Sequence, residues 1–250
     1  MQKINAKRWL SGILAAILLL AVFPLGTFAE EGDLTITTKE ELLQFAQSVS
    51  GGESYTGKTV VLAANLSLAG EDFAGIGSSA APFKGTFDGQ NHIVSDLSSS
   101  VGFFADVNGG TVKNLIVRGM VNGASNIAGV VGKLTAGAVQ NCGNEASVSG
   151  GANVGGVVGS VNGDCAVSGC YNSGAVSGTT GYIGGVTGQH WRAGTVENCY
   201  NIGTVSGPAT VGGITGGHKA SSPVLRNCYS AGAVVDTAGN QNNIGAVIGA

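Results

Sequence analysis

Three histidines, His92, His190 and His218, are the side chains of this sequence best suited to bind a metal ion or to move a proton near neutral pH. A zincin peptidase needs His-Glu-x-x-His on a helix, so that two imidazoles and a glutamate meet at the ion. None of the three histidines is followed by glutamate. The sequence therefore lacks that active site, and it predicts neither a metal site nor a cofactor.

Two of these histidines belong to a candidate ligand-binding cluster. His190 and His218 are 28 residues apart, and each follows a similar glycine-rich phrase, with Trp191, Arg192 and Lys219 beside them in the segments "GQHWRAG" and "GGHKASS". An aromatic ring with nearby hydrogen-bond donors can hold a sugar ring or a partner protein. We interpret the five residues as a platform on two stacked loops. The alternative is that these are two variable loops that happen to carry polar residues.

Acidic residues could cleave polysaccharides if they gathered as paired carboxylates, or with calcium and a base. Here the acids fall at different positions of the repeat described below: Asp88, Asp96, Asp106, Glu145, Asp164, Glu197 and Asp236. Asp88 precedes Gly89, which is typical of a turn. The sequence predicts structural roles for these acids and no catalytic residue.

The cysteines follow a regular spacing. Cys142, Cys170, Cys199 and Cys228 are 28, 29 and 29 residues apart, and Cys165 falls outside this series. Disulfides are common in exported chains. Residues stacked at the inter-strand distance of about 4.8 Å are nevertheless farther apart than the roughly 3.8 Å between the Cβ atoms of a disulfide. We expect buried, reduced thiols that pack as small apolar residues; bridges, including Cys165–Cys170, are the alternative.

The cysteine spacing belongs to a longer repeat. The phrase "VENCYNIGTVSG" (196–207) recurs in altered form at 139–150, 167–178 and 225–236, and alternates with "VGGVVG", "IGGVTG", "VGGITG" and "IGAVIG". Each unit contains about three short apolar segments and no helix. The sequence predicts an all-β fold, a parallel β-helix with three short strands per coil of 28–29 residues. Crossover chirality predicts a right-handed solenoid.

Equal positions of successive coils should lie above one another. Besides the cysteines, two further columns are expected, one of tyrosine and one of asparagine: Tyr171, Tyr200 and Tyr229; Asn144, Asn172 and Asn201. Asparagine amides at a bend can hydrogen-bond along such a stack. The repeat recurs because each coil must match its neighbours.

The first residues read as a secretory signal peptide, residues 1–29. Lys3, Lys7 and Arg8 precede a short apolar run, 13–22, and cleavage is expected near Ala29. An uncleaved membrane anchor is the alternative. We therefore expect a secreted or cell-surface protein with no membrane span after cleavage.

Two segments follow the signal peptide. Residues 30–57 are expected to form a cap with a helix near 38–50, because Thr38 and Glu41 form a capping box. Residues 58–250 are expected to form the β-helix, with clear repeats from about 112. The final "NNIGAVIGA" stops inside a repeat, so we expect the natural chain to continue past Ala250.

Charge excludes some partners. Charged residues make up 11% of the sequence, against about 25% in ordinary globular chains. Without the three cations of the signal peptide, the 12 basic residues fall to 9, against 15 acidic ones. No basic cluster remains that could neutralise a phosphate backbone, so the sequence predicts no nucleic-acid partner.

The sequence resembles the GLUG-motif proteins, a family of bacterial secreted and surface β-helical segments. The resemblance rests on "VGGVVG", "IGGVTG" and "VGGITG", on "NCGN", "GCYN" and "NCYN", and on "FKGTFDGQNHIVSDL" (83–97) with "VGFFADV" (101–107). It covers most of the chain from about Thr38. It implies modules of large surface proteins, and the same motif is an accessory segment in some IgA-cleaving metallopeptidases.

The expected function is that of a non-catalytic module, a rigid spacer or an adhesion surface for a glycan or a host or cell-surface protein. Two other interpretations stay open. One is a carbohydrate-active β-helix whose catalytic coils lie outside this chain, and the other is an accessory segment of a surface metallopeptidase.

Overall fold

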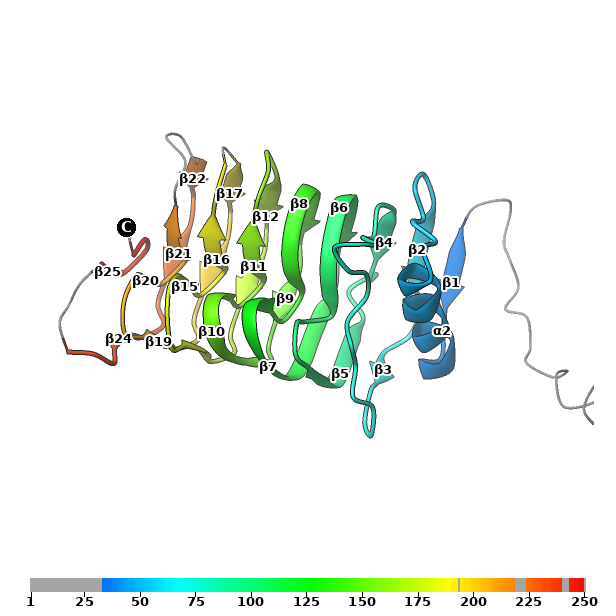
Figure 1. The fold of residues 1–250 in the computed structure, drawn as a ribbon, viewed down its shortest axis with the longest axis horizontal. Coiled ribbons are helices and arrows are strands. Elements are labelled where there is room, and N and C mark those ends of the chain that lie inside the picture. The colour runs from blue at the N-terminus through cyan, green and yellow to red at the C-terminus, as the bar shows by residue number, and fades with distance from the viewer. Residues whose placement is uncertain (1–32, 193, 219–223, 240–242, 250) are drawn as a thin grey trace, which may run out of the picture.

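A computed structural model of the chain describes residues 33–192, 194–218, 224–239 and 243–249. These residues form a parallel β-solenoid whose coils stack along one axis, with a single helix among the described residues at the amino-terminal end (Figure 1). The expected signal peptide, 1–29, and Lys219 lie outside the described residues. No helix of the described part has the length and apolar character needed to span a bilayer.

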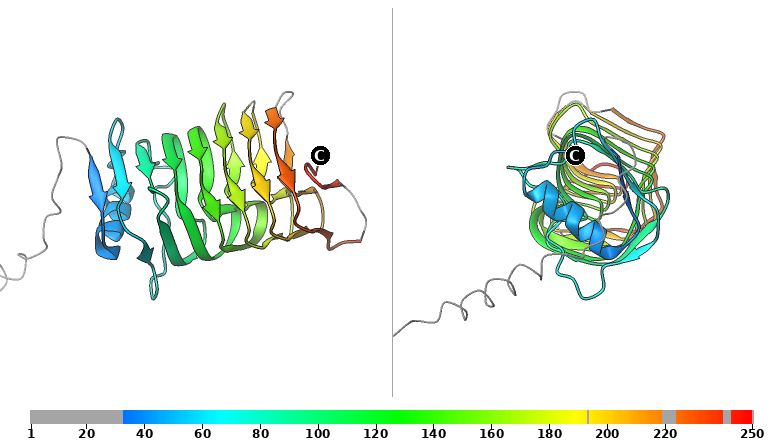
Figure 2. Two further views of the ribbon diagram at one scale, coloured as in Figure 1. Left: turned by 180° about the vertical axis from the view of Figure 1, so that it is seen from behind. Right: turned by 90° about the vertical axis from the view of Figure 1, so that its right-hand side faces the viewer.

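The helix, α2 (Lys39–Ser50), begins with the predicted capping box. The Thr38 hydroxyl accepts from the Glu41 amide, and the Glu41 carboxylate accepts from the Thr38 amide. The apolar face of α2 is buried against the first coil, so the helix lies across the end of the solenoid (Figure 2). The sequence interpretation missed β1 (Leu34–Ile36), which pairs with β2 (Thr59–Leu62) and brings part of the cap into the solenoid sheet.

Two parallel sheets wind along the solenoid. The first has 11 strands. In addition to β1 and β2 they are β4 (Thr86–Asp88), β6 (Phe104–Lys113), β8 (Val131–Gln140), β11 (Val158–Val161), β12 (Ala166–Ser168), β16 (Thr187–His190), β17 (Thr195–Glu197), β21 (Thr215–His218) and β22 (Val224–Arg226).

The second sheet has 14 strands. They are β3 (Leu66–Ser67), β5 (Ile93–Ser99), β7 (Ile116–Ala128), β9 (Gly143–Asn144), β10 (Ser147–Gly155), β13 (Tyr171–Asn172), β14 (Val176–Gly178), β15 (Ile183–Gly184), β18 (Tyr200–Asn201), β19 (Val205–Gly207), β20 (Val211–Gly212), β23 (Tyr229–Ser230), β24 (Val234–Asp236) and β25 (Ile244–Gly245).

The number of strands per coil changes along the axis. The coil from β8 to β10 has the three predicted strands, β8, β9 and β10. In the next coil β8 is matched by two shorter strands, β11 and β12, and β10 by β14 and β15. Bends that interrupt the backbone ladder therefore divide the same three segments into five short strands.

One corner of every repeat requires a left-handed backbone. The residue just before the cysteine column has a φ of 54° at Asn114, 52° at Asn141, 64° at Gly169, 54° at Asn198 and 52° at Asn227. Asparagine and glycine are the residues that adopt this region at least cost. The asparagine or glycine before each cysteine is thus explained by the backbone conformation of the turn, and its side chain need not belong to a binding or catalytic site.

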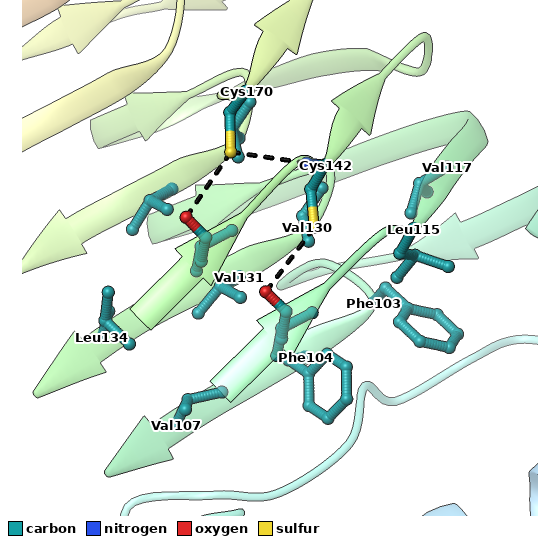
Figure 3. Close-up of a cluster of buried hydrophobic side chains, with 14 of the residues drawn as sticks. Phe103, Phe104, Val107, Leu115, Val117, Val130, Val131, Leu134, Cys142 and Cys170 are labelled. Atoms are coloured by element: carbon teal, nitrogen blue, oxygen red, sulfur yellow. Dashed lines mark hydrogen bonds between the residues drawn. The ribbon is translucent and has the colours of Figure 1, made fainter. Parts of the chain in front are cut away.

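The core changes in character along the axis. At the amino-terminal end Phe45, Phe83, Phe87, Phe103 and Phe104 are buried, and their ring centroids lie 5.2–6.0 Å apart in successive contacts. Further along, valine, leucine and cysteine fill the interior, and the thiols of the first two stacked cysteines point into the same cluster (Figure 3). Each coil therefore buries its apolar face only by stacking on its neighbours.

Candidate functional site

Several of the acidic side chains are ion-paired with the next coil. The Lys113 ammonium lies 3.2 Å from the Asp88 carboxylate and the Lys133 ammonium 3.0 Å from that of Asp106. Burial by itself would raise the pKa of Asp88, but hydrogen bonds from the Asn114 side chain and a backbone amide, together with Lys113, hold that pKa below its ordinary value. A carboxylate held ionised in this way suits cross-coil pairing and not proton donation.

The cysteines are free thiols in the structure. Cys142, Cys165, Cys170 and Cys199 are buried and Cys228 is partly buried. The thiol of Cys170 donates to the Ser168 carbonyl at 3.3 Å, and the other three thiols of the column make the same contact two residues back. Burial raises the pKa of Cys170 well above its ordinary value, which keeps the thiol protonated and poorly nucleophilic.

Asparagines form a buried ladder through the coils. Asn144 Nδ2 donates to Asn172 Oδ1 at 2.6 Å, and Asn172 Nδ2 donates to Asn201 Oδ1 at 2.7 Å. Each amide also donates to a backbone carbonyl two residues on, at 2.8–2.9 Å. The ladder satisfies buried polar groups between coils, so these residues hold the repeat together.

Tyrosines stack on the outer side of the same strands. The rings of Tyr171 and Tyr200, and those of Tyr200 and Tyr229, have centroids 5.4 Å apart and are nearly parallel. The Tyr171 hydroxyl donates to Glu145 at 2.7 Å. The Tyr229 ring is 57% exposed at the end of this series.

The predicted histidine cluster is divided between the inside and the outside of the solenoid. His190 and His218 are in register on β16 and β21. The sequence interpretation placed both in loops, whereas they are the last residues of strands. His190 is only 2% exposed, while Trp191 is 41% exposed and Arg192 is also exposed. The first residue therefore faces the interior and cannot share an outer platform with the two that follow it.

Burial changes the acid–base behaviour of His190. Desolvation is the main cause that lowers the pKa of its imidazole to about 4, and the neighbouring His218 lowers it further. The ring is therefore neutral at physiological pH. Its Nε2 atom is buried and has no hydrogen-bond partner within the described structure.

A second surface was not recognised from the sequence. An open groove of about 640 Å³ crosses several coils beside β10, β14 and β19. It is lined by small and hydroxyl-bearing residues: Asn122, Gly123, Ser149, Gly150, Gly151, Ser177, Gly178, Thr179, Ser206, Pro208 and Thr237. Ser149, Ser177 and Ser206 are register partners on successive coils. The recurring "VSG" triplet was the sequence signal for this groove.

Comparison with known proteins agrees with this architecture. Residues 179–206 match the family model described as the GLUG motif. The matched segment spans one coil, from before β15 to within β19, and contains the buried histidine and one member of each ladder. The chain is thus an all-β parallel β-solenoid that carries a GLUG motif.

One solved structure extends the comparison over most of the chain. A protein from Bacteroides ovatus, described as a "putative immunoglobulin A1 protease", has a similar fold, with a TM-score of 0.62 and 20% sequence identity over 85% of this chain and 80% of that chain. At this identity the similarity shows the fold alone. No curated protein matches the sequence.

Proposed function

We propose that this chain is a non-catalytic β-helix module that acts outside the cell as a rigid spacer with an adhesion surface. The observation that carries the proposal is the continuous set of side-chain ladders through the coils. Asparagine amides, tyrosine rings and ion pairs all bridge one coil to the next. Residue types that could have formed a catalytic centre are thereby used for coil-to-coil cohesion.

Rigidity follows from how these contacts are distributed. Neighbouring coils are held together by backbone ladders on both sheets and, along the asparagine ladder, by side-chain hydrogen bonds from one coil to the next. Bending the solenoid would have to break several of these at once, because they share one register. An elongated shape that keeps its length is what a spacer requires.

Two surfaces support a binding role. The groove beside β14 offers stacked hydroxyl groups and backbone close to the surface, which suits the hydroxyl-rich face of a glycan. Trp191 and Arg192 directly follow β16 and offer an aromatic ring and a guanidinium, and both residue types are enriched in binding hot spots. In the proposed role, the elongated module holds these surfaces at a distance from its point of attachment.

Export is supported by the sequence features at the amino terminus and by the GLUG motif, which the family resemblance associates with secreted and surface proteins. Secretion with cleavage near Ala29 is part of the proposal. Mass spectrometry of the amino-terminal peptide of the exported protein tests it directly.

A glycan and protein array tests the adhesion role. We expect the purified chain to bind a defined set of surface glycans or proteins, and one of two variants to lose that binding: Trp191→Ala/Arg192→Ala or Ser177→Ala/Ser206→Ala. Ile202→Ala is the matched control, because it removes an apolar side chain that is 54% exposed and lies outside both surfaces. Binding by none of the folded proteins would rule out adhesion and leave the spacer role.

A second candidate function comes from the solved structure of similar fold. Its description as a "putative immunoglobulin A1 protease" favours an accessory segment of a surface peptidase. In that case the chain should bind immunoglobulin A1 without cleaving it. Surface plasmon resonance with immobilised immunoglobulin A1, together with gel analysis of the antibody after incubation, separates this function from glycan adhesion.

A further inference from the structure

One interior column of the solenoid changes from apolar residues to histidine. Register pairs connect Val107 to Leu134, Leu134 to Val161, Val161 to His190 and His190 to His218. The first three are fully buried and His190 is 2% exposed. Two imidazoles therefore occupy consecutive positions where the preceding coils place aliphatic side chains.

Core packing does not account for this change. A valine at position 190 would continue the column with no polar atom to satisfy, whereas a buried imidazole costs desolvation free energy unless it is bonded. Nε2 of His190 is buried and has no hydrogen-bond partner within the described structure. A buried nitrogen in a regular repeat requires a partner, either a water molecule or an ion.

A small cavity lies beside both rings. It measures about 50 Å³ and is lined by His190, Val196, Thr215, His218, Val224, Leu225 and Ile248. This volume holds one or two water molecules or one small ion. Apart from the two imidazoles, the only side-chain polar group in the lining is the Thr215 hydroxyl, which is bonded to Thr187 at 2.8 Å.

We propose that His190 and His218 form a binding site for a late first-row transition-metal cation in this cavity. The two imidazoles supply nitrogen ligands from adjacent coils, and water completes the coordination shell. Imidazole nitrogen is a ligand that such metals favour, while Mg²⁺ and Ca²⁺ prefer oxygen. The described residues contain no group of three or more His, Cys, Asp or Glu side chains placed to hold a metal ion, so the site is a two-histidine one.

The position of the second histidine supports this assignment. His218 is exposed and lines the cavity, so it gives the cavity an edge toward solvent through which a cation can enter. A bound cation would bridge two coils that are otherwise held here by the backbone ladder and the Thr187–Thr215 hydrogen bond, and would thereby stabilise the carboxyl-terminal part of the solenoid.

Isothermal titration calorimetry of the purified chain with ZnCl₂ tests the proposal, with MgCl₂ as the counter-probe. We expect saturable binding of one Zn²⁺ per chain, no binding of Mg²⁺, and a rise in the thermal unfolding midpoint on adding Zn²⁺. His190→Val should abolish both effects while it keeps the fold, because valine occupies the same column at Val161. His218→Gln, at an exposed position, should abolish them as well.

His92→Gln is the matched control, since its ring lies in an earlier coil beside Asn65 and away from the cavity. This variant should bind Zn²⁺ as the parent chain does. The proposal is overturned if the parent chain does not bind Zn²⁺, if binding survives in either His190→Val or His218→Gln, or if His92→Gln loses it. Circular dichroism of each variant separates lost binding from lost folding.

Discussion

The side chain of Asn172 lies directly against the backbone of Gly156, so that a Cβ atom at position 156 would stand 2.5 Å from both Cγ and Oδ1 of that amide. The same relation recurs one coil on, between Asn201 and Gly185. In the phrases "VGGVVG" and "IGGVTG" the second glycine therefore contacts an amide of the asparagine ladder, and in "VGGITG" Gly213 contacts Ser230 in the same way. The close contact explains why the two phrases of the repeat occur together.

Replacing Gly185 by valine should destabilise the solenoid by at least about 2 kcal/mol. The Cβ atom of the new side chain would stand 2.5 Å from Cγ of Asn201 and 2.2 Å from the Gly213 carbonyl oxygen, so the buried amide or the backbone of the next coil would have to shift. Urea denaturation followed by circular dichroism measures the effect. Ala175→Val is the control, because this alanine is exposed and adds no conflict. Equal midpoints for the two variants would contradict the packing relation.

Replacing Asn172, the central residue of the asparagine ladder, should lower the free energy of unfolding because its hydrogen bonds are lost, whatever the size of the new side chain. Asn172→Ala would remove the acceptor of Asn144 and the donor to Asn201, leaving buried groups unsatisfied at about 1–3 kcal/mol each. Asn172→Asp keeps the shape but loses both N–H donors and buries a charge, so its unfolding midpoint should be at least as low. If the aspartate variant were as stable as the parent, the hydrogen bonds would not be what holds the ladder.

Much of the architecture could be predicted from the sequence, because the spacing of the repeated residues shows which positions pair between successive coils. Once the cysteines are seen at intervals of 28 and 29 residues, the tyrosine and asparagine neighbours must fall on successive coils, and the structure pairs Tyr171 with Tyr200 and Asn172 with Asn201. The capping helix was equally readable, since Thr38 and Glu41 satisfy each other locally.

The sequence interpretation was less successful where two coils had to be compared position by position. His190 was assigned to a loop from its polar neighbours, whereas aligning "VGGVVGSV" with "IGGVTGQH" places it opposite the buried Val161. The strand β1 was missed because three residues carry too little periodicity to be recognised, and it forms only by pairing with β2. The hydroxyl groove requires the stacked arrangement, which no single repeat contains.

Thiol accessibility should follow the position of each cysteine in the stack. With Ellman's reagent under native conditions we expect at most the partly buried Cys228 to react, because the other four thiols are shielded by burial. Burial raises the pKa of Cys165, Cys170 and Cys228, and a hydrogen bond with Cys170, together with burial, raises that of Cys199, so accessibility and not acidity sets Cys228 apart. In denaturant all five should react. Fewer than five after unfolding would mean that disulfides form in the protein, contrary to the free thiols of the structure.

Acid should weaken the contact between Glu145 and the tyrosine stack. Burial alone would raise the pKa of Glu145, but hydrogen bonds from Tyr171 and Arg118 lower it below its ordinary value of 4.5. Because the folded pKa is the lower one, the stabilisation is complete above the unfolded pKa and is lost as the pH falls through the folded pKa.

The measurement for this contact is the urea midpoint as a function of pH. Between about pH 5 and pH 3 the parent chain should lose more stability than Glu145→Gln, which has no carboxylate to protonate. Glu40→Gln, at an exposed position of the helix, should follow the parent. A pH profile of Glu145→Gln identical to that of the parent would show that this carboxylate does not contribute.

The change of the interior from phenylalanine through valine to threonine and histidine gives the solenoid a direction of growth. Buried aromatic rings provide the largest apolar area per residue, so the first coils are the natural nucleus, and each later coil adds to an edge that already exists. Because a nascent chain is synthesised from its amino terminus, the aromatic coils that form the nucleus are made before the later coils that stack on them. Amide hydrogen exchange should accordingly be slowest around Phe87 and Phe104, and the exchange rate should increase coil by coil toward β21.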